Sequence, residues 1–171
     1  MTGLARDEVD ALLDAWRRER PDLDVAPMEV LSRISRLAHH LDRRRAAAFS
    51  AHGLESWEFD VLAALRRSGE PYQLTPGQLV RETLVTSGTM TNRVDRLAAR
   101  GLVNRDDHPG DRRGVLVRLT DRGRATVDAA LADLLAAERA MLQGLADADR
   151  TQLVRALRQL LAERPTAAER R

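Results

Sequence analysis

Apolar side chains recur at intervals of three and four residues through most of this 171-residue chain. That spacing places them along one face of an α-helix, so it predicts a series of amphipathic helices. The first of these lie over residues 6–20, 27–51, 55–68, 75–84 and from residue 86 to a stop at Gly101. Two longer helices follow, one capped by Thr120 and one capped by Asp147. The pattern therefore predicts a mainly α fold.

The stretch from residue 86 to residue 120 departs from the helical pattern in its second half. Its first half has one apolar helical face, formed by Met90, Val94, Leu97 and Ala98. Its second half holds two short apolar runs, 102–103 and 115–117, separated by a His-Pro-Gly turn, which is typical of a hairpin. A capping box with an early proline, at residues 75–78, begins the preceding helix. Helix, turn, helix and hairpin in this order predict a winged helix-turn-helix.

The polar side of the helix that begins at residue 86 carries groups that can read DNA. Hydroxyl, amide and guanidinium groups stand at Thr89, Asn92 and Arg96. Asparagine and arginine can each make two hydrogen bonds to a base edge in the major groove. The tip of the predicted hairpin carries Asp111, Arg112 and Arg113. An arginine in that position suits the negative potential of a narrow minor groove, so we interpret the whole stretch as a DNA reader.

Charge is distributed unevenly along the chain. Residues 1–30 hold eight acidic side chains against four arginines, whereas residues 86–105 hold four arginines against one aspartate. Positive charge is therefore concentrated on the predicted reading helix, as binding to a phosphate backbone requires. All 28 basic residues are arginine, which explains a pI of 10.2 at a net charge of only +2. A GC-rich coding bias accounts for the preference for arginine itself.

What the sequence lacks argues against several classes of protein. It has no cysteine, which removes thiol nucleophiles and cysteine–zinc sites. It also lacks a glycine-rich phosphate loop and the HExxH and GxSxG patterns, so we expect neither an enzyme nor a cofactor. The four histidines are scattered, which favours ordinary surface histidines and leaves metal binding as a minor alternative. No apolar stretch has the length of a membrane helix or the position of a secretion signal, so a cytoplasmic location is expected.

Leucine-rich helices at both ends of the chain exceed what a winged helix needs to close its own core. We expect one compact domain with three regions: an N-terminal extension helix at 1–26, a helical dimerisation region at 27–53 and 121–171, and the winged helix-turn-helix at 54–120. A homodimer is favoured because helix-turn-helix proteins usually read paired half-sites about 10 bp apart through a two-fold axis. A helical bundle within one chain is the alternative explanation of the same leucines.

The order of these elements and the sequence of the hairpin resemble the multiple-antibiotic-resistance regulator (MarR) family. In DRRGVLVRLTDRGR, an Asp-x-Arg followed by Leu-Thr and a later Gly is similar to the family's wing, at Asp111, Arg113, Leu119, Thr120 and Gly123. The segment RLAARGLVNR also resembles the family's connection from recognition helix to wing. The resemblance covers roughly residues 28–163 and implies a dimeric winged helix that binds DNA.

The resemblance also implies particular contacts with a palindromic operator in double-stranded DNA. The side chains facing the major groove would be those of Ser87, Thr89, Thr91 and Asn92, together with Arg96. Arg113 would enter the minor groove, with Arg112 beside it and Asp111 orienting its guanidinium. The alternative is that Asp111 and Arg113 only stabilise a turn, although a surface ion pair contributes little energy.

The N-terminal sequence AWRRERPDLD, ahead of PMEVLSRI, resembles the urate-responsive branch of that family. This resemblance implies that a small anion binds one tryptophan, one aspartate and two arginines, at Trp16, Asp60, Arg93 and Arg105. On a helical wheel, Arg93 lies at the rim of the apolar face. Asp60 lies beside the apolar row that contains Trp57, so both charged groups need polar partners. Alternatively, Asp60 and Arg93 form a structural salt bridge that braces the reading helix, and Trp16 belongs to the core.

Together these features predict a dimeric, sequence-specific transcriptional regulator. We expect a repressor that urate or a related purine releases from its operator, because the released form binds the ligand better than the DNA-bound form does. One alternative is a MarR-type regulator that answers another small molecule, a carboxylate or a phenol. The other is a ligand-independent, architectural DNA-binding protein. The proposed constellation of one tryptophan, one aspartate and two arginines separates these possibilities, since only a regulator of the first kind requires it.

Overall fold

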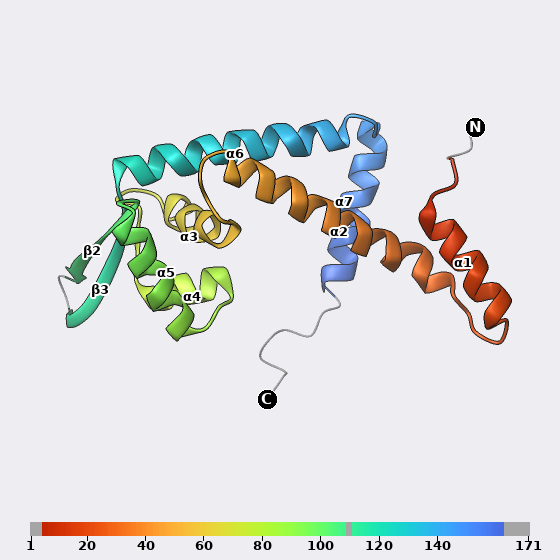
Figure 1. Cartoon of the computed structure of the whole chain (residues 1–171), viewed down its shortest axis with the longest axis horizontal. Helices are drawn as coiled ribbons and strands as arrows, with labels where there is room; N and C mark the ends of the chain where they lie inside the picture. The colour runs from red at the N-terminus through yellow and green to blue at the C-terminus, as the bar shows by residue number, and fades with distance from the viewer. Residues whose placement is uncertain (1–4, 109–110, 163–171) are drawn as a thin grey trace. The chain divides into compact units, whose positions relative to one another are not determined.

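The computed structural model describes residues 5–108 and 111–162, and the side chains of residues 108 and 111–113 also lie outside the description. The elements follow one another as α1 (Glu8–Glu19), α2 (Ala26–Ser50), α3 (Ser56–Arg67), β1 (Gln73–Leu74), α4 (Pro76–Thr83), α5 (Ser87–Ala99), β2 (Val103–His108), β3 (Asp111–Leu119), α6 (Asp121–Leu142) and α7 (Asp147–Ala162) (Figure 1). Every predicted helix is confirmed. The chain divides into two compact units, Met1–Leu134 and Leu135–Arg171. None of the described helices combines the length and the apolar composition that crossing a bilayer requires.

The core of the first unit lies where α3 meets α5, the sheet and the start of α6. α3 is buried on most of its faces, because apolar residues fill position 59 and positions 61–65. α5 contributes its predicted apolar face, of which Met90, Val94 and Leu97 are buried. The end of α2 joins this core through Phe49, whose ring stacks on Phe59 at 4.0 Å between centroids. Burial of this apolar surface is the main stabilising term, and it fixes α5 against α3.

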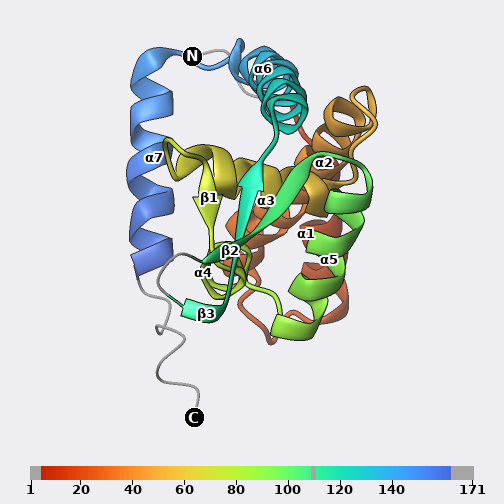
Figure 2. The same ribbon diagram turned by 90° about the vertical axis from the view of Figure 1, so that its left-hand side faces the viewer.

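The wing is a three-stranded antiparallel sheet in which β3 lies between β1 and β2 (Figure 2). Val103 of β2 pairs with Leu119 of β3, and Arg105 pairs with Val117. Both long strands extend beyond the apolar runs that predicted them. Residues 104–107 are all polar, so they show no alternation that would mark a strand. β1 has only two residues and was not predicted, because so short a segment has no readable period.

Polar caps determine where α4 and α6 begin. The Oγ1 atom of Thr75 accepts the backbone N–H of Gln78 at 3.2 Å, which confirms the predicted capping box. The Oγ1 atom of Thr120 accepts the N–H of Gly123 at 2.9 Å and so begins α6. A Cβ atom at Gly123 would overlap the carbonyl oxygen of Leu102. Glycine is therefore what allows the first turn of α6 to approach the base of the wing.

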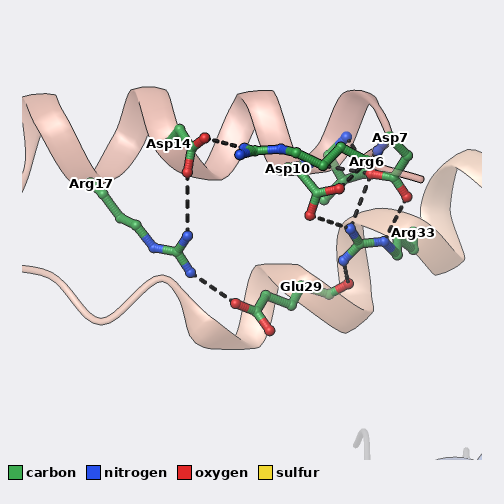
Figure 3. A network of polar contacts seen from close by, with 8 residues as sticks. Arg6, Asp7, Asp10, Asp14, Arg17, Glu29 and Arg33 are labelled. Carbon is green, nitrogen blue, oxygen red and sulfur yellow. Dashed lines mark hydrogen bonds and ion pairs between the residues drawn. The ribbon is translucent and has the colours of Figure 1, made fainter. Parts of the chain in front are cut away.

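α1 packs on the first half of α2 around a small apolar cluster, formed by Val9, Leu13 and Val25 with Met28 beside it. Charged side chains join the two helices around this cluster (Figure 3). Arg33 of α2 donates from Nε to Asp7 at 2.8 Å and from Nη2 to Asp10 at 2.7 Å. Arg17 of α1 donates to Glu29 of α2 at 2.8 Å. The Arg33 guanidinium lowers the pKa of Asp7 to about 2.

Large apolar side chains outside the winged helix are exposed in the single chain. They include Val30, Leu31 and Leu37 on α2, Leu131, Leu135 and Leu142 on α6, and Leu153, Val154, Leu157, Leu160 and Leu161 on α7. α7, which begins at the predicted cap residue Asp147, buries none of its described residues. Exposed apolar surface of this extent marks interaction sites. It agrees with a dimerisation region, and the assignment of that region stays a prediction.

Candidate nucleic-acid interface and ligand site

α5 presents a polar face on the side opposite the core. The side chains predicted to face DNA from this helix are all exposed: Ser87, Thr89, Thr91, Asn92 and Arg96. The Oγ1 atoms of Thr86, the N-cap residue, and Thr89 lie 2.9 Å apart. The Thr91 hydroxyl donates to the carbonyl oxygen of Ser87 at 3.2 Å. This face therefore offers hydroxyl, amide and guanidinium groups together, which is the set that hydrogen bonding to base edges and phosphates needs.

The ring of Trp57, on α3, contacts two arginines of α5. The guanidinium carbon of Arg96 lies 4.6 Å from the ring centroid and that of Arg93 lies 5.3 Å from it, both within cation–π range. Arg96 also donates from Nη2 to Oε1 of Glu55 at 2.7 Å, and the indole Nε1 donates to Oε2 of the same carboxylate at 2.8 Å. The Trp57 hydrogen bond, followed by the Arg96 hydrogen bond, lowers the pKa of Glu55. Sequence spacing predicts only an apolar row for Trp57 and misses this contact with another helix.

A buried carboxylate lies close to the same site. Glu58 is 1% exposed, and its two carboxylate oxygens accept from Nη1 of Arg100 at 2.6 and 2.5 Å. Nη2 of Arg100 donates to the carbonyl oxygen of Gly53 at 2.8 Å. This pair ties the end of α5 to the first turn of α3. Sequence reasoning missed it, although Glu58 stands at helical spacing with the buried Val61 and Leu62, and an acid within an apolar stripe is a usable signal.

The residues predicted to bind a ligand lie in separate places. Asp60 is exposed and lines a hollow of about 260 Å³ at α2 and α3, together with Asp42, Arg45, Phe49 and Ser56. Arg93 lines a different hollow, on the exposed face of α5. Arg105 is ion-paired with Asp95, and Trp16 of α1 is 43% exposed. Within the described part of the chain, Asp60 and Arg93 form no ion pair with each other.

The wing supplies the remaining predicted DNA contacts. Arg118 of β3 donates from Nε to Asp106 of β2 at 2.8 Å, which braces the two strands against each other. The backbones of Asp111, Arg112 and Arg113 belong to the start of β3. Their side chains lie outside the described residues, so their roles at the DNA stay predictions.

His40 and His52 have ordinary structural neighbours. Nδ1 of His40 lies 2.8 Å from Nη2 of Arg43, and Nε2 of His52 lies 2.7 Å from Oδ2 of Asp133. Among residues 5–108 and 111–162, no three histidine, aspartate or glutamate side chains gather closely enough to hold a metal ion. The first contact lies within α2, and the second joins the turn after α2 to α6.

The chain is similar in sequence to known transcriptional regulators. A model of the MarR family matches residues 52–114, the segment that includes α3, α4, α5 and most of the wing. The HTH-type transcriptional regulator PecS of Dickeya dadantii is 41% identical over 146 residues, which cover 85% of this chain and 88% of that protein. The HTH-type transcriptional repressor NicR of Pseudomonas putida is 37% identical over 111 residues, which cover 63% of this chain and 68% of that protein.

Solved structures show the same likeness. A point mutant of Escherichia coli MarR in complex with operator DNA has a TM-score of 0.63 and 27% identity, with coverage of 81% of this chain and 99% of that chain. BpsR of Bordetella bronchiseptica, whose DNA binding is regulated by 6-hydroxynicotinic acid, has a TM-score of 0.57 and 30% identity. The match covers 75% of this chain and 98% of the BpsR chain.

Proposed function

Because the chain belongs to the MarR family of winged-helix transcriptional regulators, we propose that the exposed face of α5 reads the bases of its operator. The chain is a DNA-binding regulator and not an enzyme. Regulators of this family bind operator DNA as dimers. Two copies of α5 would therefore enter major grooves about 34–36 Å apart, one in each half-site. The observation that carries this proposal is the set of exposed polar side chains on α5, opposite its buried apolar face.

Each part of the surface has a separate proposed task at the DNA. Ser87, Thr89, Thr91 and Asn92 contact base edges and nearby phosphates, with Asn92 as the residue best suited to a bidentate contact. Arg96 contacts a phosphate at the edge of the groove. At the wing, Arg113 enters the minor groove, Arg112 contacts the backbone and Asp111 orients Arg113. The peptide N–H groups at the start of α5 add further attraction for phosphate.

The dimer is proposed to form through the helices outside the winged helix. Exposed leucines and valines on α2, α6 and α7 support this, because a single chain leaves them in contact with water. A two-fold axis between the two chains would place the two reading helices symmetrically, as a palindromic operator requires.

The chain is further proposed to be a repressor released by a small anion, urate or a related purine, which Trp16, Asp60, Arg93 and Arg105 bind. The hollow beside Asp60, about 260 Å³, is smaller than the ~300–1,000 Å³ of pockets for drug-sized ligands, so it favours a small effector. Asp60 and Arg93 line separate hollows. A ligand that bridges them therefore has to move α5 relative to α3, and that movement would couple the ligand to DNA release.

A second class of effector is a small carboxylate. The similarity to BpsR favours it, since the DNA binding of that protein is regulated by 6-hydroxynicotinic acid. Both classes are planar anions that a guanidinium can recognise through paired hydrogen bonds.

A mobility-shift titration on the DNA upstream of the chain's own gene tests these proposals. We expect wild-type protein to bind, and urate to weaken binding more than 6-hydroxynicotinic acid does. Asp60→Asn and Arg93→Ala should bind DNA but lose the response to urate. The opposite order of the two ligands would favour the carboxylate class. Binding that neither ligand changes would favour a ligand-independent protein, and absence of binding would refute the role of α5.

A further inference from the structure

Arg96 stands on the exposed face of α5, yet its guanidinium is already engaged within the protein. Its Nη2 lies 2.7 Å from Oε1 of Glu55, and its guanidinium lies over the ring of Trp57. Glu55 is itself held for this contact, because its Oε2 accepts the indole N–H at 2.8 Å and its backbone N–H donates to Glu58 at 2.9 Å. Glu55 and Trp57, at the start of α3, therefore hold the guanidinium of Arg96 in one position.

Arg100, four residues further on at the C-cap of α5, also pairs with a carboxylate, but with a buried one. Its partner Glu58 is 1% exposed, and a buried carboxylate that loses its partner is strongly unfavourable. That bond therefore keeps α5 in place whether or not DNA is bound. The side chains of Arg96 and Glu55 are 54% and 58% exposed, and an ion pair so open to water contributes little to stability. Arg96 can therefore exchange Glu55 for another partner without disturbing the fold.

We propose that Glu55 competes with DNA for Arg96, and that operator binding transfers the Arg96 guanidinium from this carboxylate to a DNA phosphate. The inference rests on the proposed role of the α5 face. A phosphate can replace a carboxylate here because both present two oxygens to the planar guanidinium fork. Glu55 is then a positioning residue. It keeps Arg96 extended over Trp57 in the free protein, and it lowers DNA affinity by the work of breaking the pair.

A double-mutant cycle of operator affinity tests this transfer. Glu55→Gln keeps the side-chain length and an acceptor for Trp57 but removes the charge, so it should tighten binding by the dimer roughly two- to ten-fold with little change in Tm. In an Arg96→Ala background the same substitution should change affinity less than about two-fold, because no arginine is left to release. Glu82→Gln, on α4, removes a carboxylate that is also exposed and paired, 3.4 Å from Arg67, and controls for the loss of one negative charge.

The salt dependence of binding gives a second readout that a purely structural role would not change. Arg96→Ala should reduce the slope of log K against log salt by about two per dimer, one phosphate contact for each subunit. If Glu55→Gln raised operator affinity equally with and without Arg96, the inference would be overturned, since a general charge effect would explain both increases. An unchanged affinity and slope in Arg96→Ala would overturn it as well. If wild-type protein bound no DNA, the proposed function itself would fail.

Discussion

The α1–α2 pair is joined by exposed ion pairs around three buried apolar residues, whereas the winged helix is built on a continuous apolar core. In the first region, Arg33, Asp7 and Asp10 are all partly open to water. In the second, side chains of α3, α4, α5, the sheet and α6 bury one another, and the carboxylate of Glu58 is enclosed. Salt and acid should therefore loosen α1 long before they affect the winged helix.

This difference has a functional meaning within the proposed regulator. α1 carries Trp16, one of the proposed ligand residues, and α5 carries the proposed DNA contacts. A helix held by exchangeable polar contacts can respond to a ligand at a small free-energy cost. A core held by apolar burial resists movement more strongly, so a shift of α5 relative to α3 needs a larger share of the ligand's binding free energy.

The largest predicted effect compares one leucine from each region. Leu62→Ala, at a fully buried position of the winged helix, should lower the free energy of unfolding by about 2–5 kcal/mol. Leu13→Ala should instead release α1 locally and lower the global free energy of unfolding by less than about 1 kcal/mol, because we expect α1, which packs around a small separate apolar cluster, to open by itself. Urea denaturation followed by circular dichroism, together with hydrogen exchange over α1, measures both. Equal global losses would show that the two regions unfold as one.

A smaller loss of stability is expected from a change at Glu58, the carboxylate buried in the apolar core. Glu58→Gln should cost about 1–3 kcal/mol of stability. This is less than for a fully enclosed pair, because the Arg100 side chain is 41% exposed and can be rehydrated. Glu82→Gln, which breaks an exposed pair on α4, should cost no more than about 1 kcal/mol. Thermal melts of the two variants give the comparison, and a Glu58→Gln melt equal to that of Glu82→Gln would contradict it.

The smallest effect on global stability, and the most local, is expected from acid at α1. Arg33 lowers the pKa of Asp7 to about 2, below its unfolded value of about 4. A depressed carboxyl pKa stabilises the folded state above the unfolded pKa, and that contribution is lost as pH falls from about 4 through about 2. Amide protection of α1 should therefore fall in this window, earlier than that of α3.

Asp7→Asn is the matched control for this pH effect. Asparagine still caps α1, because its side-chain oxygen accepts the same backbone N–H groups, but it does not titrate. The amide protection of α1 should already be lower at pH 4 in this variant, and it should change less between pH 4 and pH 2. A wild-type profile in Asp7→Asn would assign the acid response to other carboxylates.

How much of this structure the sequence predicts depends on how far apart in the chain the interacting residues lie. The helices, the capping residues Thr75 and Thr120, and the exposed face of α5 all follow from repeats within a few residues, and the structure confirms them. The Arg96–Glu55 and Arg100–Glu58 bonds join residues 41 and 42 positions apart, which no local period reveals. The Arg33 contacts could have been anticipated from the acidic surplus on α1, although the exact partners could not.

The most direct test of the central claim is the operator affinity of wild-type protein and Asn92→Ala, measured across a range of salt concentrations. A reading face on α5 predicts a steep salt slope, because each dimer contacts many phosphates. It also predicts that Asn92→Ala weakens binding about ten-fold or more with an unchanged melt, because a bidentate base contact is lost in each half-site. A flat slope, or an Asn92→Ala affinity equal to that of wild type, would contradict the account.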